Sequence, residues 1–283
     1  MRACRQAAGL IAVVAALSAS LSAQWPSYST RNVPRTPDGR PNLLAPTPRT
    51  PDAKPDLSGI WLNPGWRELG AQTGVSGTGG APGTPSVLPR GPGLFFDIGS
   101  GVPGGLPFQR WAADLRKKRM AEGSKDNPDA HCLPMGNMQL QTHPQPRKII
   151  QAPDVIVILY EGNAGIRQIF TDGRPLPTND PQPWWYGYST GQWEGDTLVV
   201  QTSSFRDEGW LDVFGSPLTD AGKMTERFRR VNFGNLEIEI TVDDPKAYTR
   251  PWTVTINQRM MLDTELIEFV CAENEKSVRH FDK

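Results

Sequence analysis

Apolar and polar residues alternate along much of the second half of the chain, which is typical of β-strands with one buried face. The clearest run is 236–242, where Leu, Ile and Val alternate with Glu and Thr. The run 155–160 is apolar throughout, which predicts a strand that is covered on both faces. Similar runs at short intervals predict further strands at 56–62, 147–151, 166–171, 224–231, 253–256 and 266–271.

A predicted hairpin at 187–200 lies in the middle of these strands. Gly195 marks its turn, between Glu194 and Asp196, because glycine adopts a positive φ at no steric cost. Residues 197–200 are β-branched or apolar, as expected of a half-buried strand. About nine short strands separated by turn residues predict an all-β protein, an antiparallel meander that forms a barrel or a strongly coiled sheet.

Residues 1–23 have the features of a signal peptide. Arg2 and Arg5 precede an apolar run at 7–21, and a cleavage point follows Ala23. The alternative is an N-terminal membrane anchor, although the apolar run is shorter than the ~20 residues of a spanning helix. With the signal removed, no membrane span is expected, and the predicted location is secreted or periplasmic.

The rest of the chain divides by composition. Residues 24–55 are rich in Pro, Thr, Arg and Asp and predict an extended tail. In this tail the segment 35–42 resembles the segment 49–56, which indicates a local duplication. Residues 56–283 are expected to form a single β domain.

Two interruptions of the β domain are expected. Residues 63–106 are dominated by Gly and Pro, which predicts a long flexible insertion. Residues 107–121 then place apolar side chains at near-helical spacing, with a basic run between them, which predicts one amphipathic helix with a solvated basic face.

Charge and cysteine content limit the kinds of partner and the cellular compartment that are expected. The 30 basic and 30 acidic residues cancel and no basic block stands out, so a nucleic-acid partner is not expected. Cys132 and Cys271 remain after signal removal and predict a disulfide in an oxidising compartment. The alternative is a pair of buried free thiols.

Several motifs together resemble a family of secreted bacterial proteins to which no activity is assigned. They lie at 55–61, 132–134, 172–174, 191–200, 225–228, 244–249 and 268–271. Gly59 and Trp61 also resemble the opening signature of lipocalins and other calycins, in which a Trp closes the bottom of a small up-and-down barrel. The resemblance therefore implies a calycin-like barrel.

The chain departs from this family at histidine positions. Members often carry histidine where this chain has Leu176, Tyr188, Leu218 and Lys223. If relatives use those histidines for metal binding or proton transfer, this chain has lost them, and it is then a binding-only variant or uses another group.

Glu226 is the candidate acid/base, because it shares a strand face with Met224 and Phe228. A carboxylate among apolar neighbours has a raised pKa unless it is paired, and such carboxylates perform acid/base chemistry. His143 and Tyr188 are the candidate assisting groups. The alternative is an ion pair between Glu226 and an arginine such as Arg227 or Arg167.

Aromatic residues supply the candidate ligand site. Trp184, Trp185 and Tyr188 lie just ahead of Trp193, and such a cluster binds a flat ligand or belongs to the core. Two arginines, Arg167 and Arg174, are candidates to hold a polar end of that ligand, structural ion pairs being their alternative use.

Other chemistries have little support in the sequence. The three histidines form no closely spaced pair and there is no cysteine cluster, so neither a metal nor a cofactor is expected. The chain has no Gly-x-Ser-x-Gly elbow, so a serine hydrolase is not expected. The sequence predicts a protein that binds a small apolar or aromatic ligand in a Trp/Tyr-lined cavity. The alternative is a cofactor-free lyase, isomerase or hydrolase that uses Glu226. The oligomeric state is left open.

Overall fold

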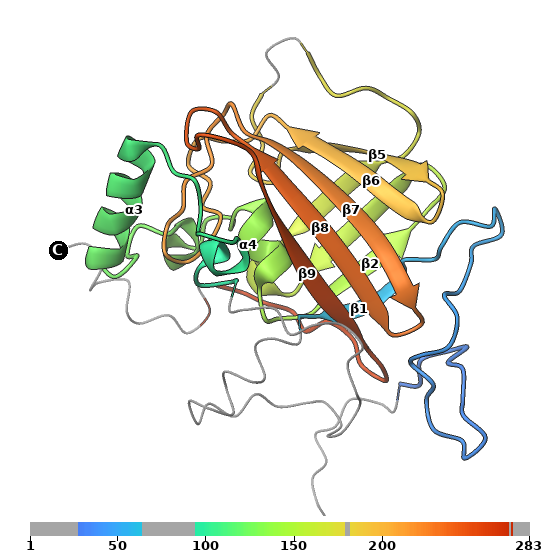
Figure 1. Cartoon of the computed structure of the whole chain (residues 1–283). Coiled ribbons are helices and arrows are strands. Elements are labelled where there is room, and N and C mark those ends of the chain that lie inside the picture. The colour runs from blue at the N-terminus through green and yellow to red at the C-terminus, as the bar shows by residue number, and fades with distance from the viewer. Residues whose placement is uncertain (1–27, 64–93, 179–181, 272, 274–283) are drawn as a thin grey trace, which may run out of the picture.

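The described strands close into a barrel whose members follow one another in chain order (Figure 1). This computed structural model describes residues 28–63, 94–178, 182–271 and 273; the predicted signal peptide and most of the predicted insertion lie outside these ranges. The strands are β1 (Gly59–Leu62), β2 (Arg147–Gln151), β3 (Val155–Tyr160), β4 (Ile166–Phe170), β5 (Tyr188–Glu194), β6 (Thr197–Ser203), β7 (Lys223–Asn232), β8 (Asn235–Asp243) and β9 (Trp252–Met261). The predicted all-β barrel is confirmed.

One neighbouring pair departs from the antiparallel meander. Strands β4 and β5 are parallel and share only two residue pairs, Ile169 with Ser189 and Phe170 with Thr190. Parallel neighbours require the connecting chain to travel back along the barrel. The chain between the two strands makes this return, and two of the four candidate aromatic residues, Trp184 and Trp185, lie in it.

The structure corrects two strand predictions. The first concerns β3, because the barrel wall has only one inner face. In β3, Ile156, Ile158 and Tyr160 are buried, whereas the residues between them are only half-buried. The prediction that this strand is covered on both faces is wrong, because the outside of a barrel wall meets solvent. Residues 266–271 form no strand; this segment runs past the last strand of a barrel that is already closed.

A buried tryptophan lies near the end of the barrel where β7 meets β8. Trp61 is fully buried, and its Nε1 donates to the Leu57 carbonyl oxygen at 3.0 Å. The guanidinium of Arg230 lies 5.0 Å from the Trp61 ring centroid. The same Arg230 donates to the carbonyl oxygens of Asp56 and Phe233, so it ties the residues just before β1 to the β7–β8 turn.

Two helices lie at the opposite end (Figure 1). α3 (Arg110–Ala121) matches the predicted helix, but Trp111 and Met120 of its expected apolar face are exposed. All six residues of α4 (Asn137–Thr142) are buried, so this short helix closes the barrel end. Short 3₁₀ turns flank them, namely η1 (Ile98–Gly101), η2 (Pro128–His131) and η3 (Gly162–Ala164). In the described part of the chain, no helix has the length and apolar character that crossing a membrane requires.

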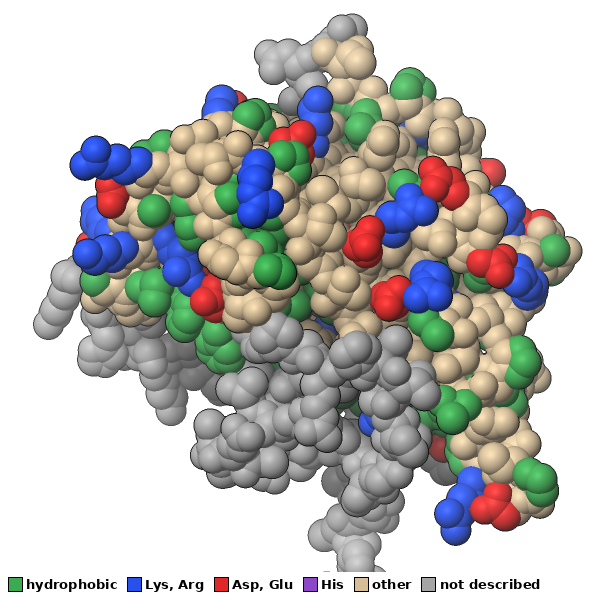
Figure 2. Space-filling view, in the orientation of Figure 1, with side chains coloured by type: hydrophobic (Ala, Val, Ile, Leu, Met, Phe, Trp, Pro, Cys, Tyr) green, Lys and Arg blue, Asp and Glu red, His purple; other side chains and the backbone are tan. Residues whose placement is uncertain are grey.

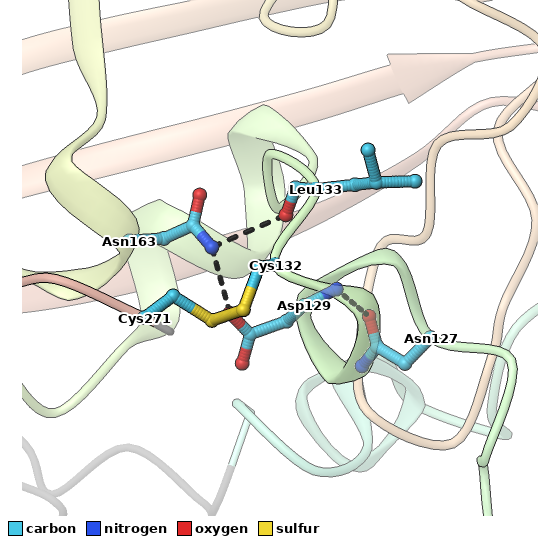
Figure 3. Close-up of a disulfide and its surroundings, with 6 residues drawn as sticks. All are labelled: Asn127, Asp129, Cys132, Leu133, Asn163 and Cys271. Atoms are coloured by element: carbon cyan, nitrogen blue, oxygen red, sulfur yellow. Dashed lines mark hydrogen bonds between the residues drawn. A yellow bond between two sulfur atoms is a disulfide. The ribbon is translucent and has the colours of Figure 1, made fainter. Parts of the chain in front are cut away.

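The predicted disulfide is present. Cys132 and Cys271 are bonded across 139 positions, with their Cα atoms 5.6 Å apart (Figure 3). Beside this bond, Asn163 donates to the Asp129 carboxylate at 2.8 Å and to the Leu133 carbonyl oxygen at 3.1 Å. The chain beyond β9 is thereby joined to the segment that leads into α4.

Candidate functional site

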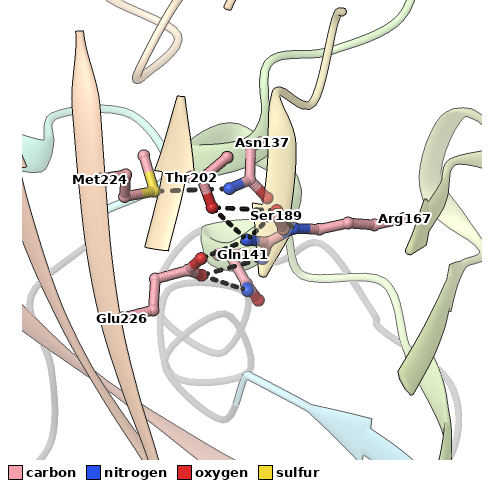
Figure 4. A network of polar contacts seen from close by, with 7 residues as sticks. All are labelled: Asn137, Gln141, Arg167, Ser189, Thr202, Met224 and Glu226. Carbon is pink, nitrogen blue, oxygen red and sulfur yellow. Dashed lines mark hydrogen bonds and ion pairs between the residues drawn. The ribbon is translucent and has the colours of Figure 1, made fainter. Parts of the chain in front are cut away.

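The candidate acid/base Glu226 lies inside the barrel, paired with Arg167. Glu226 is on β7 and Arg167 on β4, and both side chains point inward because they occupy inner positions of alternating strands. Arg167 Nη1 donates to Glu226 Oε1 at 3.0 Å, and Nη2 contacts the other carboxylate oxygen (Figure 4). The two side chains are 1% and 0% exposed, so the pair is removed from solvent.

Neighbouring side chains complete this inner network. Gln141 of α4 donates to Glu226 Oε1 at 2.9 Å, and the Ser189 and Thr202 hydroxyls accept from Arg167 at 3.1 and 3.0 Å (Figure 4). Burial opposes the positive charge of Arg167, but the adjacent Glu226 carboxylate outweighs this effect and raises the Arg167 pKa. Both carboxylate oxygens are therefore engaged, and the network joins α4 to four strands, β4, β5, β6 and β7.

Glu226 consequently has the environment of a structural ion pair. The alternative partner Arg227 lies on the outer face, where it donates to Glu194 at 3.1 Å. An acid/base catalyst must reach the proton that it transfers. A buried carboxylate bonded to both Arg167 and Gln141 offers no free oxygen to a substrate.

His143 lies apart from that network, just after α4. Its ring meets Phe95 edge-to-face, with centroids 4.8 Å apart, and its Nδ1 accepts from the Gln145 backbone N–H at 3.2 Å. Burial, together with the charge of Arg147, lowers the His143 pKa to about 3. The imidazole is therefore neutral near pH 7. Its ring contacts with Phe95 and with the Gln145 N–H are structural.

The outer face of the barrel holds a different group, here called the outer aromatic cluster: Phe170, Arg174, Trp184 and Tyr188. The Tyr188 ring centroid is 5.2 Å from that of Phe170 and 5.3 Å from that of Trp184. The Arg174 guanidinium lies 4.1 Å from the Phe170 ring centroid and donates to the Tyr188 hydroxyl at 3.4 Å. The cluster bridges β4, β5 and the segment between them.

Asp172 holds the arginine of this cluster in place. Arg174 Nε donates to both Asp172 carboxylate oxygens at 2.9 Å, and Nη2 donates to one of them at 2.5 Å. Hydrogen bonds from Arg174 lower the Asp172 pKa, and the same bonds raise the Arg174 pKa. The pair is thus charged on both sides and neutral overall, while Trp184 is 42% exposed beside it.

The structure divides the predicted ligand-binding residues among several places. Trp184, Tyr188 and Arg174 come together, whereas Arg167 lies inside the barrel. The Arg206 guanidinium lies 4.7 Å from the ring centroid of Trp185. The Nζ atom of Lys54, in the tail, lies 5.6 Å from the ring centroid of Trp193. A single site made of all the predicted residues is therefore not formed.

Sequence reasoning missed two contributors to the outer cluster and three to the inner network. Phe170 could have been found from strand alternation, since it faces the opposite side from Arg167 and Ile169. Asp172 falls within the motif at 172–174 but was not among the candidate site residues. The inner network also uses Gln141, Ser189 and Thr202, whose only signal is a polar residue at an inward position of a strand or within a buried helix.

Neither metal-binding groups nor similar proteins indicate what this site does. Within the ranges that the structure describes, no group of three or more His, Cys, Asp or Glu side chains could hold a metal ion. Comparisons with family models, with curated proteins and with solved structures find no match to this chain.

Proposed function

We propose that the protein binds a small neutral aromatic molecule that carries a hydroxyl or another polar substituent, and that the outer aromatic cluster is the binding site. The observation that carries this proposal is an exposed tryptophan, Trp184, beside a tyrosine and a fixed arginine. Aromatic rings that already pack edge-to-face offer a rigid surface on which a flat ligand loses little entropy.

The charge balance of the cluster determines the class of ligand. Arg174 is already paired with Asp172, so an anionic ligand would gain little from its charge. A hydroxyl group can accept a hydrogen bond from Arg174 and donate one to Asp172. A phenol or an aromatic alcohol therefore matches this site better than an aromatic carboxylate does.

The family resemblance and the signal-like N-terminus support the same proposal. Tyr188 stands at a position where members of that family often carry histidine, and in this chain its ring is the centre of the outer cluster. If relatives use that histidine for metal binding or proton transfer, its replacement by a stacking group fits a binding role. The disulfide is compatible with the proposed extracytoplasmic location.

Calorimetric titration with 2-naphthol tests this function. Binding is expected for the wild-type protein, and Trp184→Ala is expected to weaken it by roughly tenfold or more because a stacking surface is lost. Trp111→Ala is the matched control, since Trp111 is a similarly exposed tryptophan on α3, away from the cluster.

Cyclohexanol serves as the non-aromatic comparison and is expected to bind far more weakly. The proposal is overturned if 2-naphthol binds no better than cyclohexanol. It is also overturned if Trp184→Ala binds 2-naphthol as tightly as the wild type and the Trp111→Ala control do. Naphthoic acid, the charged analogue, is expected to bind no more tightly than the naphthol.

A further inference from the structure

Two loops in the tail have the same sequence pattern and the same fold. The first loop is 35–41 and the second loop is 49–55, and each is closed by a bridge between its terminal Arg and Pro residues. In each loop the threonine N–H donates across the loop at 2.9 Å, to the Arg40 or the Lys54 carbonyl oxygen. The duplication seen in the sequence is therefore a duplicated structural unit.

The side-chain contacts inside the two loops also correspond. Arg35 Nη1 donates to the Gly39 carbonyl oxygen at 2.7 Å, and Arg49 Nη1 donates to the Ala53 carbonyl oxygen at 2.9 Å. Gly39 and Ala53 occupy the same position and both have positive φ, 81° and 64°. Ala53 adopts an unfavourable backbone conformation for a residue with a Cβ, which shows that the loop geometry is strongly imposed.

The second loop is docked on the barrel through an acidic turn. Arg49 donates to both carboxylate oxygens of Asp196, at 2.8 and 2.7 Å, in the turn between β5 and β6. The Arg49 hydrogen bonds lower the Asp196 pKa. Lys54 lies over the ring of Trp193 in the same hairpin, and Pro55 is buried. The second loop thus recognises a carboxylate with an aromatic ring beside it.

The first loop carries the same recognition groups in an exposed position. Arg35, Arg40 and Pro41 correspond to Arg49, Lys54 and Pro55, and all three are exposed. Among the described residues, Arg35 makes no ion pair, and Arg40 pairs only with Asp38 of its own loop. In Figure 1 the first loop, in darker blue, extends away from the barrel, and side chains of both charges lie on this projection in Figure 2.

We infer that the first loop is a docking element for another protein that presents an acidic β-turn next to an aromatic residue. The charge complementarity is the one already seen between Arg49 and Asp196, because the fork of an arginine matches a carboxylate through two parallel hydrogen bonds. The chain's own acidic turn is occupied by the second loop, so the first loop is left for a separate partner. Its internal hydrogen bonds hold Arg35 in position before binding, which reduces the entropy cost.

A cyclised peptide that copies residues 190–201 and carries a fluorescent label provides the probe. Fluorescence polarisation with the whole protein is expected to show binding that weakens as salt is added. Arg35→Ala is expected to weaken binding by about tenfold or more, as is Asp196→Asn in the peptide, because either change removes the paired hydrogen bonds. Arg49→Ala in the protein is the matched control and is expected to retain binding.

Arg35→Lys separates charge from geometry and is expected to bind between the wild type and Arg35→Ala. Thermal unfolding of each variant shows whether the fold is retained; Arg35 is exposed, so the melting temperature is expected to stay unchanged. The inference is overturned if the wild type does not bind the peptide, if Arg35→Ala binds as tightly as the wild type, or if the Asp196→Asn peptide binds equally well.

Discussion

The buried pair of Arg167 and Glu226 shows how one residue can be misinterpreted from sequence. An isolated buried carboxylate would suggest acid/base chemistry, whereas a paired one is expected to retain its charge and hold strands together. Here the carboxylate contacts Arg167 and Gln141, and Arg167 also donates to Ser189 and Thr202. At the scale of the residue, the partner across the barrel determines the chemistry.

Glu226→Gln is expected to lower the free energy of unfolding by about 3–5 kcal/mol, because the positive charge of Arg167 stays buried without its counter-charge. Urea denaturation measures this change. Glu237→Gln is the control, since it breaks the more exposed Arg229–Glu237 pair within the β7–β8 hairpin and is expected to cost less than about 1 kcal/mol.

Adding Arg167→Met to Glu226→Gln is expected to recover at least half of the loss. Ser189 and Thr202 remain hydrogen-bonded to each other at 2.9 Å, and Gln141 can still donate to the amide oxygen. A loss below about 1 kcal/mol for Glu226→Gln alone would contradict the structural role of the pair.

Strand positions could be predicted from sequence because alternation reports directly on burial. The limits of β2 and β3 agree with the prediction, since each is a short run bounded by turn residues. The parallel pairing of β4 with β5 could not be predicted, because it depends on where residues 171–187 travel. The sequence did not predict α4, because this helix is only six residues long and mostly polar. Its residues are buried because the helix lies at the end of the barrel.

The candidate site was predictable only in part, for the same reason. Trp184 and Tyr188 are close in sequence. Arg174 lies next to them because β5 begins beside Phe170, which Arg174 also contacts. Trp193 is on the same strand as Tyr188, but its described ring contact is with Lys54 of the tail. Closeness in sequence therefore identified the cluster, whereas the contacts made in three dimensions decided its membership.

His143 is expected to make the stability of the folded protein depend on pH. Its pKa is about 3 in the folded protein, against about 6.5 in the unfolded chain. The unfolded chain therefore binds the proton first, so the stabilising effect is complete above about pH 6.5 and is lost as the pH falls toward 3.

Between pH 7 and pH 5 the wild-type protein is expected to lose about 2 kcal/mol of unfolding free energy through this group. Urea denaturation at the two pH values measures the loss. His143→Asn retains an acceptor for the Gln145 N–H and is expected to lose far less over the same interval. An equal loss in the variant would assign the pH dependence to other groups.

At the scale of the whole molecule, the disulfide joins elements that the barrel alone leaves apart. Cys271 lies beyond β9, and Cys132 lies just before α4, so the bond connects the end of the described chain to the segment that closes the barrel. Removing the bond with Cys132→Ser and Cys271→Ser together is expected to lower the free energy of unfolding by about 4–5 kcal/mol, because a long loop becomes free in the unfolded chain. Urea denaturation with and without a reductant measures this loss. The wild type should approach the double variant when reduced, while the double variant should be insensitive to the reductant. A difference below about 1 kcal/mol between the oxidised wild type and the double variant would mean that the barrel holds both segments without the bond.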